Sequence, residues 1–168
     1  SLYTDDYRSG ERTFQLLTQA VGRAGRGERR GEAVIQTYSP DHYAIQASAA
    51  QDYESFYQEE IRYRELMGYP PAEELLAVHV SCEDEELLEK GCHYLKEYIL
   101  MAKGRLEVRV IGPASPGIDK IKDVYRRVIY MKAPQYDVLI KMKDRLEQYI
   151  EINSGFDKMR IQFDFNPM

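Results

Sequence analysis

The chain has 168 residues, of which 43% are hydrophobic, so we expect one domain with an appendage. No apolar run approaches the length of a membrane span, and no basic segment followed by an apolar one opens the chain, so we expect a soluble, cytoplasmic protein. Cys82 and Cys92 lie ten positions apart without a CxxC, which favours two core residues over a disulfide framework or a metal site.

The net charge of −5 is unevenly distributed along the chain. Residues 22–31 carry four arginines and one glutamate, and residues 105–132 carry seven lysines or arginines against three acids. Residues 41–74 carry two arginines and eight acids. Because local patches set the field at a binding surface, the acidic total does not exclude a nucleic-acid partner.

The first predicted element is a helix over residues 11–21. Phe14, Leu17 and Val21 recur at spacings of three and four, which places them on one helix face. Glycines end this pattern, and the apolar residues 33–38 predict a short strand. Because this helix and strand lack a sheet to cover their apolar faces, we expect the segment to be poorly held.

Two more helix starts follow. Ser39-Pro40 predicts one, because serine can cap a helix and proline fits its first position. Asp52 predicts another, with an aromatic face that runs to Gly68 and ends before Tyr69-Pro70-Pro71. The glutamates of this helix are expected on its solvated face, without a catalytic or metal role: Glu54, Glu59, Glu60 and Glu65.

Beyond residue 71 the pattern alternates strands with helices. Period-two alternation predicts strands, and apolar stripes at helical spacing predict two helices. The strands are expected at 76–82, 106–110, 124–132 and 159–165, and the helices at 84–104 and 139–149. The order β-α-β-β-α-β predicts an α+β, ferredoxin-like fold, in which two helices cover one face of a four-stranded antiparallel sheet.

The run Gln19-Ala20-Val21-Gly22-Arg23-Ala24-Gly25-Arg26 carries the most distinctive chemistry. Arg23 and Arg26 are three apart, so they stand on nearly the same side of a helical turn. Guanidinium groups bind phosphate oxygens in pairs, and an arginine at a transferring phosphoryl group is a major device of nucleotide hydrolysis. The alternative is a basic helix end with a glycine cap.

The sequence offers no self-contained active site. Gly112 to Gly117 has the glycine spacing of a phosphate-binding loop, but Ile118-Asp119 stands where lysine and a hydroxyl are needed, and two prolines remove backbone donors. It is therefore predicted to be a turn between strands. The histidines are isolated, so capping or surface roles are expected for His42, His79 and His93.

A second informative stretch places cations and an aromatic side chain around a loop and the start of a strand. Its members are Lys120, Lys122, Tyr125, Arg126 and Arg127. Phosphates attract cations without reading sequence, and tyrosine can stack on an unpaired base. These residues are predicted to contact DNA, and the alternative is a solvated hairpin whose charge is diluted by Asp119 and Asp123.

The Gln19 to Arg26 run, taken with its flanks, resembles the family of primosomal protein N′ (PriA), the replication-restart helicases of superfamily 2. In that family the run is helicase motif VI, with Val-Ala where this chain has Ala20-Val21. The resemblance covers essentially the whole chain, through Asp6-Tyr7-Arg8, Glu11 to Gln19, Tyr38 to His42, Asp52-Tyr53, Tyr69-Pro70-Pro71, Ile111-Gly112-Pro113 and Asp164-Phe165-Asn166-Pro167-Met168.

The resemblance implies the C-terminal part of an ATP-dependent 3′ to 5′ DNA helicase that recognises stalled or branched forks and restarts replication through primosome assembly. It implies that Arg26 and Arg23 contact the γ-phosphate of ATP and that Gln19 orients the same site, in the intact enzyme only. ATP with Mg²⁺ and structural Zn²⁺ are implied for the intact protein, whereas this chain is expected to hold no cofactor and to be no enzyme alone.

The implied partners are forked and single-stranded DNA, the acidic tail of single-stranded-DNA-binding protein and other primosome proteins, with no membrane. In the family, a basic residue of the C-terminal domain helps to hold the tail. The loop at Gln135-Tyr136-Asp137 is not basic, so that residue stays unassigned here.

The resemblance divides the chain into three parts. Residues 1–45 are expected to be the end of the second RecA-like helicase lobe, residues 46–71 a connecting helix, and residues 72–168 a DNA- and partner-binding domain whose fold resembles a small-subunit ribosomal protein. The alternatives are a stand-alone ferredoxin-like domain with a polar pocket for a small ligand, and a purely structural interaction domain.

Overall fold

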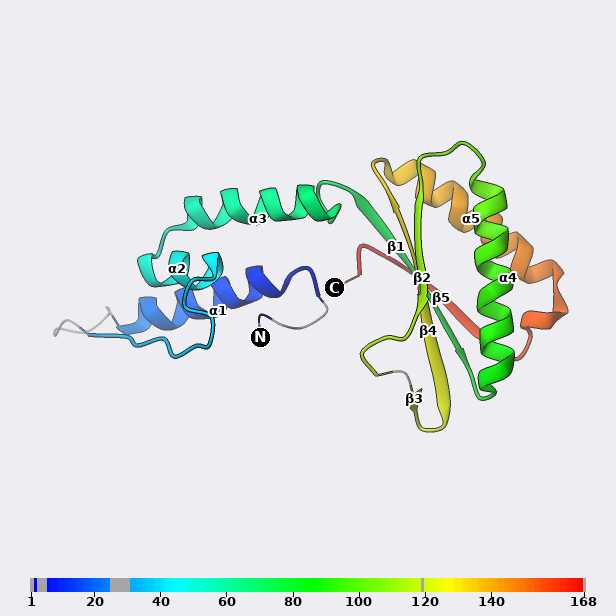
Figure 1. Ribbon diagram of the computed structural model, residues 1–168, viewed down its shortest axis with the longest axis horizontal. Coiled ribbons are helices and arrows are strands. Elements are labelled where there is room, and N and C mark those ends of the chain that lie inside the picture. The colour runs from blue at the N-terminus through cyan, green and yellow to red at the C-terminus, as the bar shows by residue number, and fades with distance from the viewer. Residues whose placement is uncertain (1, 3–5, 25–30, 119, 168) are drawn as a thin grey trace. The chain divides into compact units, whose positions relative to one another are not determined.

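The computed structural model describes residues 2, 6–24, 31–118 and 120–167, and the chain divides into two compact units, residues 1–67 and residues 68–167 (Figure 1). The first unit is helical, and the second is a sheet covered by helices. The three-part division that the sequence suggests stays a prediction.

The first unit contains α1 (Ser9–Ala24), α2 (Tyr43–Ala50) and α3 (Tyr53–Met67). These helices share a small core of Phe14, Ala44, Ala47 and Phe56, in which the rings of Phe14 and Phe56 stack with centroids 4.1 Å apart. The predicted first helix is confirmed, and it continues through Gly22. It packs against α2 and α3, which supply the apolar cover.

The strand predicted over residues 33–38 is wrong, because residues 31–38 form no strand. Val34 and Tyr38 are exposed. A strand needs a neighbouring backbone for its hydrogen bonds, and the described part of this unit offers only helices beside the segment.

The helix starts differ in part from those predicted. Helix α2 begins at Tyr43 rather than after Ser39, and His42 is its N-cap, since the His42 ring nitrogen Nδ1 accepts the Ala44 N–H at 3.1 Å. The capping role of His42 is thus confirmed, and burial lowers its pKa. Asp52 starts α3 as predicted, and Gly68, at φ +65°, follows its end.

The prediction that Glu60 lies on a solvated face is wrong. Glu60 is 6% exposed, its Oε1 accepts from Arg64 Nε at 2.9 Å, and its Oε2 accepts from Tyr43 Oη at 2.7 Å. Arg64 also reaches Glu11 Oε2 at 2.8 Å. Because Glu11, Tyr43 and Arg64 belong to different helices, this buried polar cluster joins all three helices of the unit.

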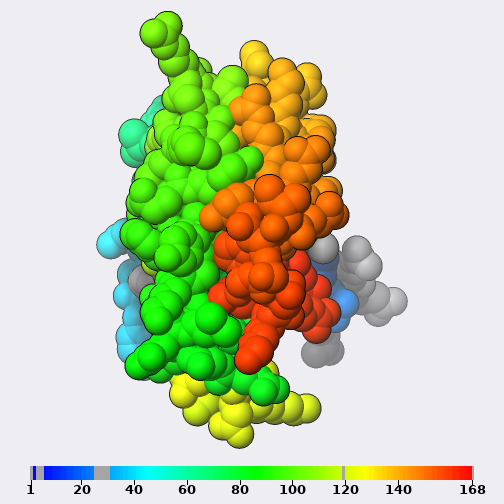
Figure 2. All heavy atoms as spheres, turned by 90° about the vertical axis from the view of Figure 1, so that its right-hand side faces the viewer, coloured from blue at the N-terminus to red at the C-terminus, as the bar shows by residue number. Residues whose placement is uncertain are grey.

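The second unit contains a mixed set of strands and helices. Their bounds are β1 (Glu74–Cys82), α4 (Glu85–Lys103), β2 (Arg109–Ala114), β3 (Lys120–Ile121), β4 (Val124–Ala133), α5 (Tyr136–Ile152), the 3₁₀ helix η1 (Ser154–Phe156) and β5 (Arg160–Phe165). The antiparallel sheet has the order β2-β4-β1-β5, with β3 paired to β4. Helices α4 and α5 cover one face (Figure 1) and lie side by side (Figure 2). The predicted α+β fold is confirmed.

The core of this unit lies between the sheet and the two helices. Alternate residues of β1, from Leu76 to Cys82, point toward the helices, as the period-two pattern predicts. The predicted helix stripes are fully buried: Leu88, Cys92, Leu95 and Ile99 from α4, and Leu139, Met142 and Leu146 from α5. Cys82 and Cys92 are free thiols in this core, and burial raises the pKa of Cys92 to about 12.

The second strand begins later than predicted, at Arg109 instead of residue 106. The pairing of β2 with β4 shifts register between Ile111 and Ala114. At this bulge Gly112 has φ +97°, and a side-chain carbon placed there would lie 2.7 Å from the Val128 carbonyl oxygen. The segment that resembles a phosphate-binding loop therefore begins within a strand pair.

The last strand is fixed to the first by Asn166, at φ +47°. Its backbone N–H donates to the Leu75 carbonyl at 2.7 Å, and its side-chain oxygen accepts the Leu75 N–H at 2.9 Å. The amide nitrogen of the Asn166 side chain also donates to Glu74 at 2.6 Å. Asn166 thus pins the end of β5 beside the start of β1.

We predict that Gly112→Ala destabilises the second unit by about 1–3 kcal/mol, because alanine is disfavoured at positive φ and its Cβ meets backbone. Urea unfolding measures the change. Gly117→Ala is the matched control, since nothing lies within 4 Å of the added carbon. Equal stability of the two variants would contradict this account of the bulge.

We predict that Arg64→Met lowers the free energy of local unfolding in the first unit by about 3–5 kcal/mol, because it leaves buried Glu60 without its cation. Hydrogen exchange of the α1 and α3 amides measures this. Arg62→Met, on the exposed side of the same helix, is the control. Similar exchange rates in the two variants would refute a structural role for the cluster.

Candidate nucleic-acid interface

The predicted basic stretch forms a hairpin between β3 and β4. Ile121 pairs with Val124, so Lys122 and Asp123 make a two-residue turn, with φ values of +49° and +64°. Turns with positive φ at both residues usually carry Asn-Gly or similar pairs. A lysine at this position is disfavoured by its backbone, since glycine adopts positive φ without steric cost.

Strand alternation distributes four of the five predicted residues over two faces of the sheet, whereas Lys122 stands in the turn. Lys120 pairs with Tyr125, and Tyr125 pairs with Cys82, whose side chain lies in the core under the helices. Arg126 pairs with Ser81, so its side chain lies on the other face. The structure therefore does not bring all five residues onto one surface.

Arg127 lies on the helix-covered face. Its Nε contacts Glu89 Oε1 at 2.7 Å, and its Nη2 contacts Glu85 Oε1 at 3.2 Å. The Arg127 side chain is only 12% exposed. That Arg127 contacts DNA stays a prediction, but two carboxylates already surround it. The sequence could have indicated these partners of Arg127, because Glu85 and Glu89 are four apart and therefore lie on one face of the predicted helix.

Lys120 interacts with its cross-strand neighbour. Its Nζ lies 4.8 Å from the Tyr125 ring centroid and 3.4 Å from the Tyr125 hydroxyl. A carboxylate oxygen of Asp123 is also 3.4 Å away. The contact with Tyr125, followed by that with Asp123, raises the pKa of Lys120. Lys120 therefore stays cationic, but its charge is shared with its neighbours.

The helix-covered side at this end of the sheet is acidic. Four consecutive exposed acids follow β1 and open α4: Glu83, Asp84, Glu85 and Glu86. Asp84 caps the helix by accepting the Leu87 N–H at 3.1 Å. Acids suit a helix N-terminus, but they repel phosphates. A nucleic acid is therefore disfavoured on this side.

The helix-free face carries a cation that the sequence reasoning missed. Arg160 is exposed on β5 and pairs with Ser81, which also pairs with Arg126. The sequence could have indicated this position, because the alternation of residues 159–165 places Arg160 on the face of the sheet that Ile161, which faces the core, does not share. Arg126 donates to the Ile118 carbonyl at 3.2 Å, a contact that leaves its charge in place.

The other cations of this face have structural partners. Arg109 contacts Glu73. Lys132 is 7% exposed, and its Nζ lies 4.1 Å from the Tyr69 ring centroid. Burial, and then the nearby Arg109, lower the pKa of Lys132. The accessible positive charge of the helix-free face therefore lies at the end with Arg126 and Arg160.

The predicted phosphate contacts lie in the first unit. Gln19 and Arg23 are exposed on α1, four residues apart and so on one side of the helix. Arg26 lies outside the described residues, so its position relative to Arg23 stays a prediction. The exposed glutamine and arginine could meet an anion presented by another part of a larger protein.

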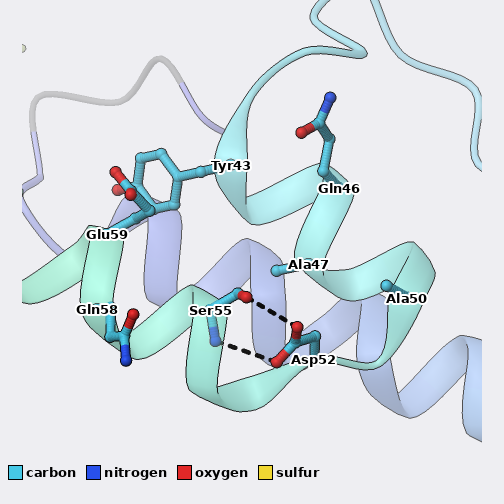
Figure 3. A pocket seen from close by; sticks show the side chains of 8 residues that line it. All are labelled: Tyr43, Gln46, Ala47, Ala50, Asp52, Ser55, Gln58 and Glu59. Atoms are coloured by element: carbon cyan, nitrogen blue, oxygen red, sulfur yellow. Dashed lines mark hydrogen bonds between the residues drawn. The ribbon is translucent and has the colours of Figure 1, made fainter.

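The hollows of the described structure offer little for a small ligand. One of about 350 Å³ lies between α2 and α3 (Figure 3), and its Asp52 is already occupied by both Ser55 donors, which lower the Asp52 pKa. Another of about 270 Å³, beside α4 and η1, is lined mainly by apolar and aromatic residues, with Lys90 as its charged group. The first of these hollows is lined mainly by polar residues, but it lies in the first unit, outside the ferredoxin-like fold to which the small-ligand alternative refers.

The described residues include no group of three or more metal-binding side chains placed to hold an ion. The two cysteines are buried in the core. The part of the chain that the structure describes therefore offers no set of ligands for a structural zinc ion. Within the same ranges, every helix is too short or too polar to cross a membrane.

Comparison with known proteins gives consistent results. Residues 65–168 match the family described as primosomal protein N C-terminal domain. The replication restart protein PriA of Bacillus subtilis is 38% identical over 171 residues, which cover 99% of this chain and 21% of that protein. The PriA of Synechocystis is 38% identical over 85% of this chain and 17% of that protein. The PriA of Thermotoga maritima is 36% identical over 86% of this chain and 19% of that protein. The chain spans about a fifth of the length of these relatives.

We predict that Lys122→Gly stabilises the second unit by about 1 kcal/mol, because glycine adopts positive φ without steric cost. Lys122→Ala removes the same charge but keeps the Cβ, so it should bring no such gain. Chemical unfolding of the two variants measures the difference. If both change stability equally, the backbone of the turn does not disfavour lysine.

Proposed function

The chain belongs to the primosomal protein N C-terminal domain family, and on that premise we propose that it is the C-terminal part of an ATP-dependent replication restart helicase. In this proposal the second unit binds DNA at stalled or branched forks. The motor that moves 3′ to 5′ and the machinery of primosome assembly belong to the intact protein.

The observation that carries the DNA-binding role is the hairpin of β3 and β4. It displays Lys122 at a tip where its backbone is disfavoured, and it ends beside Arg126, whose charge has no carboxylate partner among the described ion pairs. Cations on a projecting hairpin reach phosphates without reading base sequence. Such a surface suits a protein that must recognise forks of any sequence.

The cations are few, so binding should be weak and strongly dependent on salt. Each phosphate contact contributes about −0.9 to the slope of log K against log salt for duplex DNA and about −0.7 for single strands. Two or three contacts then give a slope of about −2 to −3. High affinity in the intact protein would come from other DNA-binding parts acting together with this one.

We predict that the 168-residue chain binds a labelled fork, and that Lys120→Ala/Lys122→Ala/Arg126→Ala weakens binding at least about tenfold at low salt, with a shallower salt slope. Fluorescence anisotropy across a salt series measures both. The control Lys96→Ala/Arg105→Ala/Lys141→Ala removes the same charge from α4, the loop after it and α5. If the two triple variants bind equally, the hairpin is not the DNA contact.

The first unit supports a second part of the proposal. Gln19 and Arg23 are exposed on one side of α1, as expected of residues that reach the γ-phosphate of an ATP–Mg²⁺ held by another lobe. Arg26 would complete this set. ATP would supply the free energy of hydrolysis, while this chain alone would hydrolyse none. The structural zinc of the intact protein would be held by residues outside this chain.

We predict that Arg26→Ala in the intact protein lowers DNA-stimulated ATP hydrolysis on the order of 1,000-fold, because the arginine stabilises charge that develops during phosphoryl transfer. Nucleotide and DNA binding should persist, which separate binding assays check. Arg12→Ala, earlier on α1, is the control. Hydrolysis at a near-normal rate would make Arg26 a cap on a helix end.

Protein partners are a further part of the proposal. The acidic tail of single-stranded-DNA-binding protein and other primosome proteins are expected to bind the intact protein. The loop at Gln135-Tyr136-Asp137 gives the tail no cation, so this chain alone should bind it weakly.

A further inference from the structure

We propose that single-stranded DNA lies across the helix-free face of the sheet in the second unit, held by a row formed by Arg126, Ser81 and Arg160. This inference rests on the proposed DNA-binding function and deepens it. It names the kind of DNA, the surface that takes it and a binding residue, Arg160, that lies outside the basic hairpin.

The row follows from the register of three adjacent strands. Arg126 of β4 faces Ser81 of β1, and Ser81 faces Arg160 of β5. Paired residues of neighbouring strands stand on the same face about 5 Å apart. Two guanidinium groups therefore flank one hydroxyl across the sheet, an arrangement that can contact successive phosphates of a strand crossing it.

The next row supplies groups that suit a base. His79 of β1 lies opposite Val128 of β4 and Gln162 of β5. Gln162 is exposed and His79 is partly exposed, whereas Val128 is 2% exposed, so the accessible part of this row lies toward β5. An imidazole ring can stack on an unpaired base, and an amide can both donate to and accept from a base edge. The two rows together offer phosphate contacts beside base contacts.

Charge separates the two sides of the sheet. The helix-covered side bears the exposed acids Glu83 to Glu86, and there Arg127 is held by Glu85 and Glu89. Neither Arg126 nor Arg160 takes part in any ion pair among the described residues. The exposed Asp164 of β5 also lies on the helix-free face, paired with Ala77 two rows from Ser81. Phosphates are therefore attracted to the Arg126 and Arg160 end of that face and repelled from the acids at the start of α4.

The shape of the face favours a single strand over a duplex. Bases inside a duplex are reached through its grooves by a projecting helix or ribbon. The rows of Ser81 and His79 lie within the sheet, and the accessible face of a sheet can bind unstacked bases of single strands. A single strand can lay both its phosphates and its bases on this face, whereas a duplex would offer only its backbone.

Three double variants of the 168-residue chain test the proposal, and each removes two positive charges. Arg126→Ala/Arg160→Ala changes the helix-free face, Lys120→Ala/Arg127→Ala changes the helix-covered face, and Arg105→Ala/Lys141→Ala is the control. Binding to a labelled oligothymidine and to a duplex of equal length is measured by fluorescence anisotropy across a salt series. Circular dichroism checks the fold.

The first variant should bind oligothymidine at least about tenfold more weakly, and its salt slope should be shallower by about 1.4, since two single-strand phosphate contacts are lost. The control pair should change affinity less than about threefold, and the Lys120/Arg127 pair, which removes one hairpin cation, should lose less affinity than the Arg126/Arg160 pair. As an independent gain of charge, Gln162→Lys should tighten binding and steepen the slope.

Failure of the unaltered chain to bind any DNA would overturn both this inference and the proposed function. Binding that is lost in the Lys120/Arg127 pair but kept in the Arg126/Arg160 pair would overturn this surface and leave the proposed function standing. Equal affinity for the duplex, with equal loss in the Arg126/Arg160 pair, would overturn the preference for single strands.

Discussion

The alternation of side chains along β4 is the constraint on which the account of this surface depends. This strand pairs with β1, β2 and β3, so every second residue of it is committed to the packed side under α4 and α5. Consecutive arginines must then face opposite ways. Two adjacent arginines of the sequence therefore enter two different electrostatic environments in the fold.

The two arginines show how the environment decides the role of a cation. Arg127 is largely buried and meets two carboxylates of α4, so its charge helps to hold the helix on the sheet. Arg126 donates to a carbonyl oxygen, which does not neutralise its charge, so this charge can attract a phosphate. Arg64 in the first unit resembles Arg127, because its acids Glu11 and Glu60 make it a link between helices.

The sequence was sufficient for the order β-α-β-β-α-β, because apolar residues at period two and at helical spacing mark the buried sides of these elements directly. It missed the two-residue strand β3, which is too short to show a period. It failed where a role depends on a distant neighbour. The strand at residues 33–38 needs a backbone beside it, and Glu60 is buried only because Arg64 and Tyr43 meet it. Arg160 joins Arg126 only through the register of β1 with both neighbours. Asn166 and Gly112, which carry part of the family resemblance, serve the fold itself.

The central claim, that DNA meets the helix-free side of this sheet, is tested most directly by observing individual backbone amides. Titration of a short oligothymidine into the ¹⁵N-labelled chain, followed by heteronuclear NMR, should shift the signals of Ser81, Arg126 and Arg160 and leave those of Glu85 to Glu89 unchanged. Shifts confined to the start of α4, with Ser81 and Arg160 unaffected, would contradict the account.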